Sequence, residues 1–438
     1  MTAQTYPDSK PDSKLYYSLF VAAVLVKCGL ATVSPSSFDF FNIARGALFV
    51  SNGTWFQGPY TFSTNFIYLF YRLWLLAPVN HQWPYQDYSF MPSPSGFLLI
   101  FILKLPLIAF DILTSVLIYQ LVLLFTADRR LSIFATLVWL FNPYLTIAIE
   151  MDGTMDIIST FLVVSATYLF VRGRYVVSGI CLALATAARF YPIALIPFYP
   201  LFLLKEGKYR KLSLMIGSYF ISLFVILLPF LASYGKGFLN VLYELPVGGN
   251  KEFIWFFGFM PSVGSTTEVK ISSVVTVLVI VVFLALRMWK NDRRLVLDMV
   301  LIALITYVGL SHWNRYYTIW VTPFLTMDLA ANWNGKCRRV YAALFTLFFL
   351  SAFVYNTAYW WSASLFYIYE FTPQVSEMAR FMLGVGDMLR TGDFGTTFSQ
   401  SVLAGACIIY SAVVVLRNTI GTKVGLMYSP TRYRESGI

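Results

Sequence analysis

Runs of about 17 to 25 apolar residues recur along the whole chain, and this repetition constrains the fold more than any other sequence feature. A bilayer core about 30 Å thick is crossed by an α-helix of about 20 such residues. Of the 438 residues, 58% are hydrophobic and 12% are charged. An ordinary soluble domain carries roughly 25% charged residues. The sequence therefore predicts an all-α, polytopic membrane protein that forms one domain over residues 1–438, with no soluble module.

Short basic loops separate the apolar runs and predict an orientation. Lys and Arg concentrate in the segments 127–130, 172–174, 205–211, 287–294 and 334–339, and in the tail from residue 417. Because cytoplasmic loops are enriched in Lys and Arg, these segments and both termini are expected in the cytoplasm, which gives about twelve spans (about 11–13). The same rule accounts for the net charge of +11 without a nucleic-acid partner.

Two long loops fall on the opposite side, at residues 34–95 and 360–399, and both are rich in aromatic residues. Aromatic rings concentrate at the membrane–water interface, so the first loop is expected to lie on the bilayer surface, with residues 64–78 as an interfacial helix or, alternatively, a short dip into the membrane. The apolar stretch 176–204 contains Arg-Phe-Tyr-Pro at 189–192. Its proline predicts two short helices that meet at a bend, or a re-entrant hairpin.

Polar positions on this outer side are candidates for chemistry, because ionisable groups within a bilayer are costly and mark functional sites. The first is Asp39, flanked by Phe38, Phe40 and Phe41 in the first outer loop. Aromatic neighbours partly desolvate a carboxylate, which suits a general base at a membrane surface. A helix cap or a solvated loop acid would give the same pattern.

Two further candidates lie in the middle of the chain. The turn within residues 140–159 carries Glu150, Asp152 and Asp156. Such acids bind a cation or the hydroxyls of an acceptor sugar, unless the turn is merely solvated. Arg189 stands alone between apolar residues, where its guanidinium fits a phosphate. An internal pair with an acid is the alternative interpretation.

The segment 311–320 is the fourth candidate. His312, Asn314, Arg315 and Tyr316 are crowded at one outer helix junction. Polar-tipped aromatic rings beside a cation are typical of a subsite for a sugar phosphate, and equally of an interfacial anchor belt.

Lys104 and Asp111 form the fifth candidate. They lie seven positions apart within one apolar run, so a helix places them on the same face. They either contribute to a site or pair with neighbouring helices.

The motifs that the chain lacks also narrow its function. It has no GxxxxGK[ST] and no GxGxxG after a strand, so a nucleotide-driven machine is not indicated. Four scattered cysteines and two histidines indicate neither a disulfide framework nor a metal site. We therefore expect no required cofactor and no metal ligands, with a role for a divalent cation left open. The activated substrate is expected to arrive through the membrane.

Several of these segments carry a family resemblance. Residues 37–53, Ser-Phe-Asp-Phe-Phe-Asn-Ile-Ala-Arg-Gly-Ala-Leu-Phe-Val-Ser-Asn-Gly, are similar to the acid-x-acid opening of the first outer loop in the GT-C polytopic glycosyltransferases. Asp39 matches the second acid, and Ser37 replaces the first. The chain resembles most closely the catalytic subunit of GPI mannosyltransferase I and its archaeal relatives, over residues 37–204 without 61–85 and again near 311–327.

Three more segments extend the resemblance. Residues 90–124 are similar to the family's second span, including Lys104 and Asp111. Residues 139–159 are similar to its Asn-Pro and Gly-x-x-Asp stretch, with Gly153 and Asp156 matching. Residues 178–197 are similar to its segment that ends in a basic residue, one more residue and Tyr-Pro, and the matching positions are Arg189, Tyr191 and Pro192.

The resemblance implies an inverting transfer of a sugar, mannose in this branch, from a dolichyl or polyprenyl phosphate to a glycolipid or glycan hydroxyl. It implies Asp39 as the catalytic base. It also implies two binding sets on the extracytoplasmic or lumenal face: Arg189, Arg315, Lys104 and His312 for the donor phosphate, and Asp156, Asp152, Tyr191, Tyr316 and Asn314 for the sugar or acceptor.

Other functions fit parts of the same pattern. A flippase for lipid-linked sugars, or another secondary transporter, also has many spans and buried charges, although the internal repeats common in transporters are not seen. A GT-C enzyme for another sugar is a further alternative. The expected location is an archaeal plasma membrane or a eukaryotic ER membrane. The sequence names no partner subunit, and its expected ligands are the donor, the acceptor and membrane lipids.

Overall fold

The fold is seen in a computed structural model that describes residues 13–34, 41, 44–48, 61–81, 83–86, 89–90, 93–189, 191–235, 294–310, 316–333, 335, 338–359 and 393–419. Helices dominate these residues, as the sequence predicts. The elements in chain order are α1 (Ser13–Val33), α3 (Thr61–Leu76), β1 (Tyr85–Gln86), β2 (Ser89–Phe90), α4 (Pro94–Thr126), α5 (Arg129–Leu140), α6 (Pro143–Thr146), η1 (Ile147–Met151), α7 (Asp156–Val171), α8 (Tyr175–Ala188), η2 (Tyr191–Leu195), α9 (Phe198–Lys205), α10 (Tyr209–Tyr234), α13 (Arg294–Leu310), α14 (Tyr317–Ala331), α15 (Arg338–Tyr359) and α18 (Asp393–Thr419).

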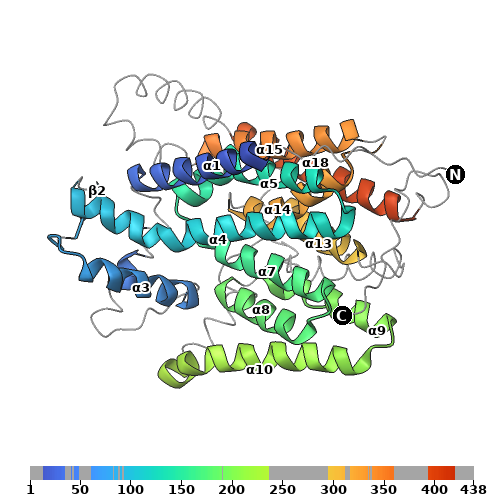
Figure 1. The fold of residues 1–438 in the computed structure, drawn as a ribbon, viewed down its shortest axis with the longest axis horizontal. Coiled ribbons are helices and arrows are strands. Elements are labelled where there is room, and N and C mark those ends of the chain that lie inside the picture. The colour runs from blue at the N-terminus through green and yellow to red at the C-terminus, as the bar shows by residue number, and fades with distance from the viewer. Residues whose placement is uncertain are drawn as a thin grey trace.

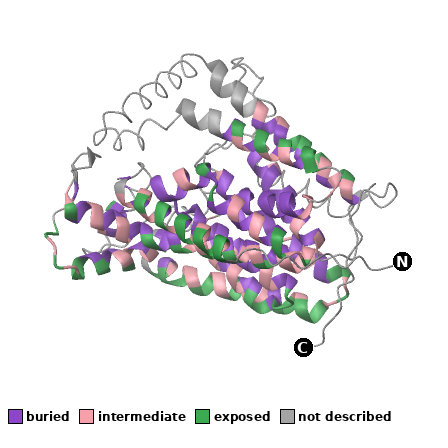
Figure 2. Cartoon of the chain, turned by 45° about the horizontal axis from the view of Figure 1, so that its top comes forward, coloured by how far each residue is buried: buried purple, intermediate pink, exposed green. Residues whose placement is uncertain are grey.

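The long helix α4 runs through the middle of the bundle (Figure 1). On one side it packs against α1 and α5, and on the other against α7. The layer continues from α7 through α8 to α10, which forms the lower edge in Figure 1. Buried residues gather along the inner helices, and exposed ones lie on the outer helices (Figure 2).

Local chemistry sets both ends of α4. Ser93 caps its first turn by accepting a hydrogen bond from the Gly96 amide, and Pro94 occupies the first position, where its missing N–H costs nothing. Ala127 ends the helix in the left-handed region at φ 52°. The helix crosses the whole bundle and carries Lys104 and Asp111 into its core, where both side chains are 0% exposed.

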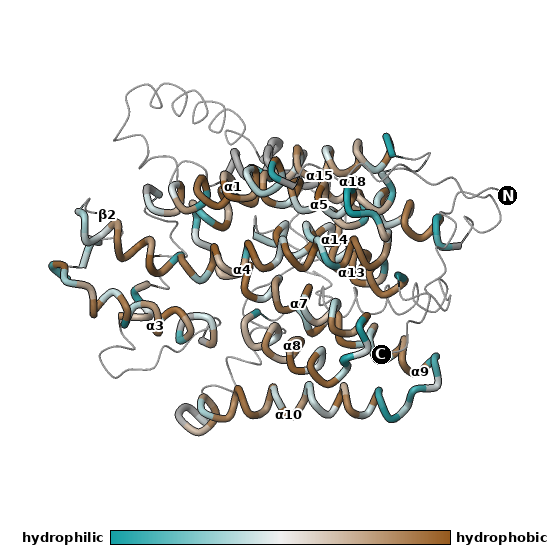
Figure 3. Tube along the Cα trace, viewed as in Figure 1, coloured by the Kyte–Doolittle hydropathy of each residue, from teal (hydrophilic) through white to brown (hydrophobic). Residues whose placement is uncertain are grey.

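Helix α10, at the lower edge of Figure 3, consists largely of hydrophobic residues. Phe220, Ile221 and Phe224 on α10 are more than half exposed. In the part of the chain that is described, three helical stretches are long and apolar enough to cross a membrane: Lys14–Thr32, Pro94–Thr126 and Tyr209–Ala232. Residues Arg129–Leu140 and Pro143–Met151 add a fourth if this pair, bent by 44°, forms one span. The total of about twelve spans and their orientation stay predictions.

Close helix contact fixes the layer of α8 and α10. A Cβ on Gly179 would collide with Ser218 Oγ and would lie 2.5 Å from the carbonyl oxygen of Met215. Only glycine therefore lets the two backbones approach this far.

Two local predictions are confirmed. The Arg-Phe-Tyr-Pro segment separates α8 from α9, with the short 3₁₀ turn η2 between them. Residues 64–78 are largely helical, as α3, although the place of α3 at the membrane interface stays a prediction. A small antiparallel ribbon of β1 and β2 follows α3, and the sequence did not predict it.

Candidate functional site

The site is centred on the carboxylate of Asp156, the first residue of α7, which is 1% exposed. Its Oδ2 accepts hydrogen bonds from Arg189 Nη2 at 2.6 Å and from Thr154 Oγ1 at 2.7 Å. Its Oδ1 accepts one from Trp320 Nε1 at 2.8 Å. An acid at a helix N-terminus is further stabilised by the helix dipole. These contacts fix the carboxylate, and through it the guanidinium of Arg189.

Arg189 lies where α8 ends, in extended backbone, and its side chain is 17% exposed. The sequence left open whether this residue binds an anion or pairs with an acid, and the structure shows the pair. A guanidinium has five N–H donors in a fixed fork, and this geometry suits carboxylates and phosphates alike.

A stack of aromatic rings forms one wall of the site. The Tyr191 ring lies on Trp320 with centroids 4.0 Å apart at 11°, and Tyr317 covers the other indole face at 4.1 Å and 26°. Both faces of Trp320 are thus occupied, and its ring is 4% exposed. The indole is therefore a rigid support for Asp156, and stacking a ligand on it would require the wall to open.

A second group of charges lies beside the site, within the membrane part of the bundle. The ammonium of Lys27 in α1 lies 3.0 Å from Asp111 Oδ2 and 3.0 Å from Glu150 Oε2. Trp139 Nε1 donates to Asp111 Oδ1 at 2.9 Å. All three charged side chains are at most 1% exposed. This arrangement supports the interpretation that Asp111 pairs with neighbouring helices.

Lys104 has a different set of partners. Its Nζ donates to three backbone carbonyls, those of Ser34 at 2.7 Å, Glu150 at 2.8 Å and Met151 at 2.7 Å. An ammonium has three hydrogens, so these carbonyls can accept all of them. This geometry favours a role for Lys104 in holding the backbone segments together. The phosphate contact expected from the sequence would require the phosphate to displace one of these carbonyls from the ammonium.

The structure brings together some of the predicted residues and not others. Asp156, Arg189 and Tyr191 meet at the aromatic wall, and Tyr316 precedes Tyr317 at the start of α14. Asp152 caps η1 and interacts electrostatically with Lys104. Four predicted residues lie outside the described part of the chain: Asp39, His312, Asn314 and Arg315.

The proposed cation site at the turn is not formed in the part of the chain that is described. Glu150 points to Lys27, whereas Asp156 points to Arg189 and Trp320. No group of three His, Cys, Asp or Glu side chains with a metal-binding arrangement occurs among the described residues. The acids of this turn therefore serve two different sets of partners.

The sequence analysis does not single out two residues that the structure places in or beside the site, Trp320 and Lys27. Lys27 is a lone lysine inside the first apolar stretch. Because charged residues within a membrane usually pair with one another, its position could have indicated a buried acidic partner. Trp320 resembles any interfacial anchor in sequence. Only its contact with Asp156, 164 positions away, distinguishes it.

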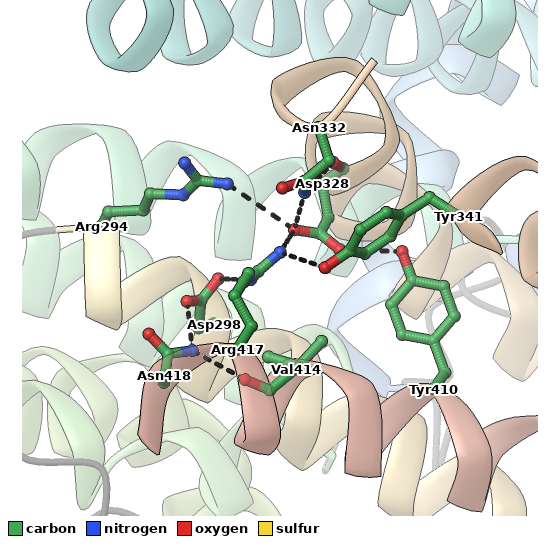
Figure 4. A network of polar contacts seen from close by, with 9 residues as sticks. All are labelled: Arg294, Asp298, Asp328, Asn332, Tyr341, Tyr410, Val414, Arg417 and Asn418. Carbon is green, nitrogen blue, oxygen red and sulfur yellow. Dashed lines mark hydrogen bonds and ion pairs between the residues drawn. The ribbon is translucent and has the colours of Figure 1, made fainter. Parts of the chain in front are cut away.

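A third polar group lies near the other end of α14 (Figure 4). Arg417 of α18 donates to Asp298 of α13 and to Asp328 of α14, in both cases at 2.7 Å. Tyr410 donates to the second oxygen of Asp328 at 2.9 Å, and Asn418 to Asp298 at 2.8 Å. Arg417 also donates to the Tyr341 hydroxyl of α15 at 3.0 Å, so the network joins four helices, and it was not predicted from the sequence.

Comparison with known proteins gives a family match over part of the chain. The family model described as GPI transamidase subunit PIG-U matches residues 46–242. GPI mannosyltransferase I, the branch expected from the motifs, is not the family that this comparison returns. No curated protein matches the chain.

Solved structures show the fold. Two crystal structures of ArnT from Cupriavidus metallidurans, one bound to undecaprenyl phosphate and one in the apo state, align with a TM-score of 0.51 each. Their sequence identities are 13% and 15%, and each alignment covers 94% of this chain and 78% of ArnT. ArnT is a GT-C glycosyltransferase. The chain is therefore a polytopic membrane protein with the GT-C fold, as expected from its motifs.

Proposed function

We propose that the protein is a glycosyltransferase that moves a sugar from a polyprenyl-phosphate or dolichyl-phosphate donor to a hydroxyl of a glycolipid or glycan. The observation that carries this proposal is the Asp156–Arg189 pair, a guanidinium fixed by a buried carboxylate in a chain with the GT-C fold. The ArnT structure with bound undecaprenyl phosphate supports a lipid phosphate as the ligand.

The reaction is a single displacement. Asp39 takes the proton of the acceptor hydroxyl, whose oxygen attacks the anomeric carbon. The bond from that carbon to the phosphate oxygen breaks, and the lipid phosphate leaves with the electron pair from the opposite face. The anomeric centre is inverted. A base of this kind contributes about 10²–10⁴-fold.

The cations of the site stabilise the negative charge that develops on the leaving group. The leaving group gains negative charge as a phosphodiester becomes a monoester, and Arg189 stabilises that charge together with Arg315 and His312. Asp156 acts through Arg189 by holding it in place. Asp152, Asn314 and Tyr316 bind sugar or acceptor hydroxyls, and Tyr191 contributes through the aromatic wall.

The test is transfer of radiolabelled mannose from polyprenyl-phosphate mannose by purified protein, with a lipid and glycan extract as acceptor. Asp39→Asn is expected to lower transfer by at least about 100-fold. Asp128→Asn is the matched control, because Asp128 caps α5 and asparagine caps a helix equally well. Transfer by Asp39→Asn at the wild-type rate would refute the assignment of the base. Donors with other sugars on the same lipid test the proposed mannose.

The PIG-U match over residues 46–242 favours a second candidate, a subunit that binds a glycolipid within a larger membrane assembly without transferring sugar. Ser37 in place of the first family acid fits this alternative. It predicts donor or glycolipid binding by wild type with no transfer, and co-purification with partner subunits. Movement of label across sealed vesicles without transfer would instead indicate a flippase.

A further inference from the structure

Lys104 lies where the ends of two helices converge. It donates to the carbonyl of Ser34, which directly follows α1, and to those of Glu150 and Met151, which close η1. The last carbonyls of a helix lack partners within the helix and carry partial negative charge. One ammonium at this junction therefore satisfies both helix ends.

Ser34 adds a second connection between the same segments. Its Oγ donates to the Met151 carbonyl at 3.1 Å, and its amide donates to Leu30 at 3.1 Å. Ser34 and Lys104 are both 0% exposed. Because water does not reach this junction, nothing replaces these hydrogen bonds when they are lost.

Both segments lead directly to proposed site residues. Asp39 follows Ser34 by five positions, and Asp156 follows Met151 by five positions. The second connection is a tight turn, since Thr154 donates to the Ala148 carbonyl at 3.2 Å and Gly153 has a φ of 70°. A displacement at the junction is therefore transmitted to Asp156.

We infer that Lys104 is a positioning residue that clamps the start of the first outer loop to the turn leading to Asp156. The clamp joins the segment that precedes Asp39 in the sequence to the turn that precedes Asp156, the partner of Arg189. This inference rests on the proposed function of Asp39 and Arg189, and it replaces the phosphate contact that the sequence suggested for Lys104.

Lys27 provides the matched control. Its ammonium is equally buried and contacts the same turn, but through the Glu150 side chain, and no backbone carbonyl of the turn is among its contacts in the structure. Lys27→Met removes a buried ammonium and leaves the carbonyl clamp. Lys104→Met removes the clamp, and Lys104→Arg keeps N–H donors at the junction.

The experiment measures three quantities in nanodiscs: the turnover at saturating polyprenyl-phosphate mannose, the Kd of that donor, and amide hydrogen exchange in the peptide 34–48. For Lys104→Met we expect turnover to fall about 100-fold, since a misplacement of about 1 Å has that effect. We expect the donor Kd to change less than about threefold, since Arg189 remains, and exchange to rise about tenfold as the clamp opens. Lys104→Arg is expected to keep turnover within about tenfold and exchange within about threefold of wild type. Lys27→Met leaves Asp111 and Glu150 without their shared ammonium, so we expect it to lower the yield and the melting temperature. In its folded fraction, exchange in the peptide 34–48 is expected to stay within about threefold of wild type, because the carbonyl contacts of Lys104 remain.

Three results would overturn the inference. Equal effects of Lys104→Met and Lys27→Met on exchange would indicate a general packing role. A parallel loss of donor binding and turnover with unchanged exchange would indicate that Lys104 contacts the donor phosphate. Wild-type turnover and exchange in Lys104→Met would leave the residue without a role.

Hydrogen exchange separates this inference from the proposed function. If the wild type transfers no sugar, the proposed function fails, and exchange alone decides whether the clamp exists. If Lys104→Met does not fold, Lys104→Gln keeps two N–H donors on a shorter side chain that cannot satisfy all three carbonyls, and faster exchange confined to the peptides 34–48 and 146–156 is then the expected result. Unchanged exchange there overturns the clamp.

Discussion

Two buried aspartates near opposite ends of α14 are bound in nearly the same way, yet the arginines that bind them differ in their surroundings. Asp156 accepts from an arginine, from an indole and from Thr154. Asp328 accepts from an arginine, from the Tyr410 hydroxyl and from Asn332. Trp320 and Asp328 are eight positions apart, about 12 Å along the helix.

The arginines differ more than the aspartates. Arg417 lies between two carboxylates, those of Asp298 and Asp328, and its side chain is 12% exposed. Among the described residues, Arg189 pairs with the carboxylate of Asp156, and it lies beside the stacked rings of Tyr191 and Trp320. Arg417 connects three helices through two buried carboxylates, which is the arrangement of a structural connector, whereas Arg189 lies at the proposed donor site. Four pairs of substitutions test this difference.

The largest effect is expected from removing each arginine. Arg417→Met removes the cation that Asp298 and Asp328 share and leaves Arg294 4.0 Å from Asp328, which costs about 3–5 kcal/mol and should strongly reduce recovery of folded protein. Arg189→Met leaves one carboxylate that keeps Trp320 and Thr154, so the protein should fold and lose transfer by about 10²–10³-fold. Thermal unfolding and the transfer assay measure the two effects. Equal stability losses in the two variants would contradict the distinction between connector and site.

Neutralising each aspartate should give the next largest effect. Asp156→Asn keeps the shape but turns an N–H group toward Arg189 or Trp320, so the donor Kd should rise about tenfold or more through the displaced guanidinium. Asp328→Asn should lower the melting temperature and leave the donor Kd of the folded fraction unchanged. The measurement is donor binding in nanodiscs. A normal Kd in Asp156→Asn would show that Arg189 needs no carboxylate to hold it.

Removing one neutral donor from each aspartate should have a smaller effect. Trp320→Phe keeps an aromatic ring between Tyr191 and Tyr317 but leaves Asp156 Oδ1 without its indole partner, at a cost of about 1–3 kcal/mol. Transfer should fall about 5- to 100-fold. Tyr410→Phe removes the matching donor to Asp328 and should lower stability by a similar amount with unchanged transfer. Reduced transfer by folded Tyr410→Phe would show that the contacts of Asp328 affect the site at the other end of α14.

The smallest effect is expected from the short side chains beside each acid. Thr154→Val removes one hydroxyl donor to Asp156 and should cost about 0.5–1.5 kcal/mol. Asn332→Ala removes the amide that donates to Asp328 at 2.9 Å and should lower stability by a comparable amount. Melting curves and donor titrations of both variants provide the measurement. A larger loss of donor binding in Asn332→Ala than in Thr154→Val would reverse the assignment of the two ends.

The sequence predicts the positions of helices and bends better than it predicts which side chains contact each other. Apolar runs and one proline are enough to predict α4 and the bend between α8 and α9, because both features depend on residues that are close together in the sequence. Asp156 and Arg189 were identified as isolated ions, but not as each other's partners, because their contact spans 33 positions and depends on how α7 and α8 pack. Lys104 was read as a phosphate ligand because sequence cannot reveal that its partners are backbone carbonyls.

The positions of the charges in α4 also bear on how the chain enters the membrane during synthesis. A lysine or an aspartate at the centre of a span costs about 2.5–3.5 kcal/mol at insertion. Lys27, the partner of Asp111, is already in place when α4 emerges, because it precedes α4 in the chain. For Lys104, the Ser34 carbonyl is also already in place, but the carbonyls of Glu150 and Met151 are synthesised 46 and 47 residues later. Integration of α4 is thus complete only when η1 arrives, and a chain truncated between the two should leave this helix poorly retained in the bilayer.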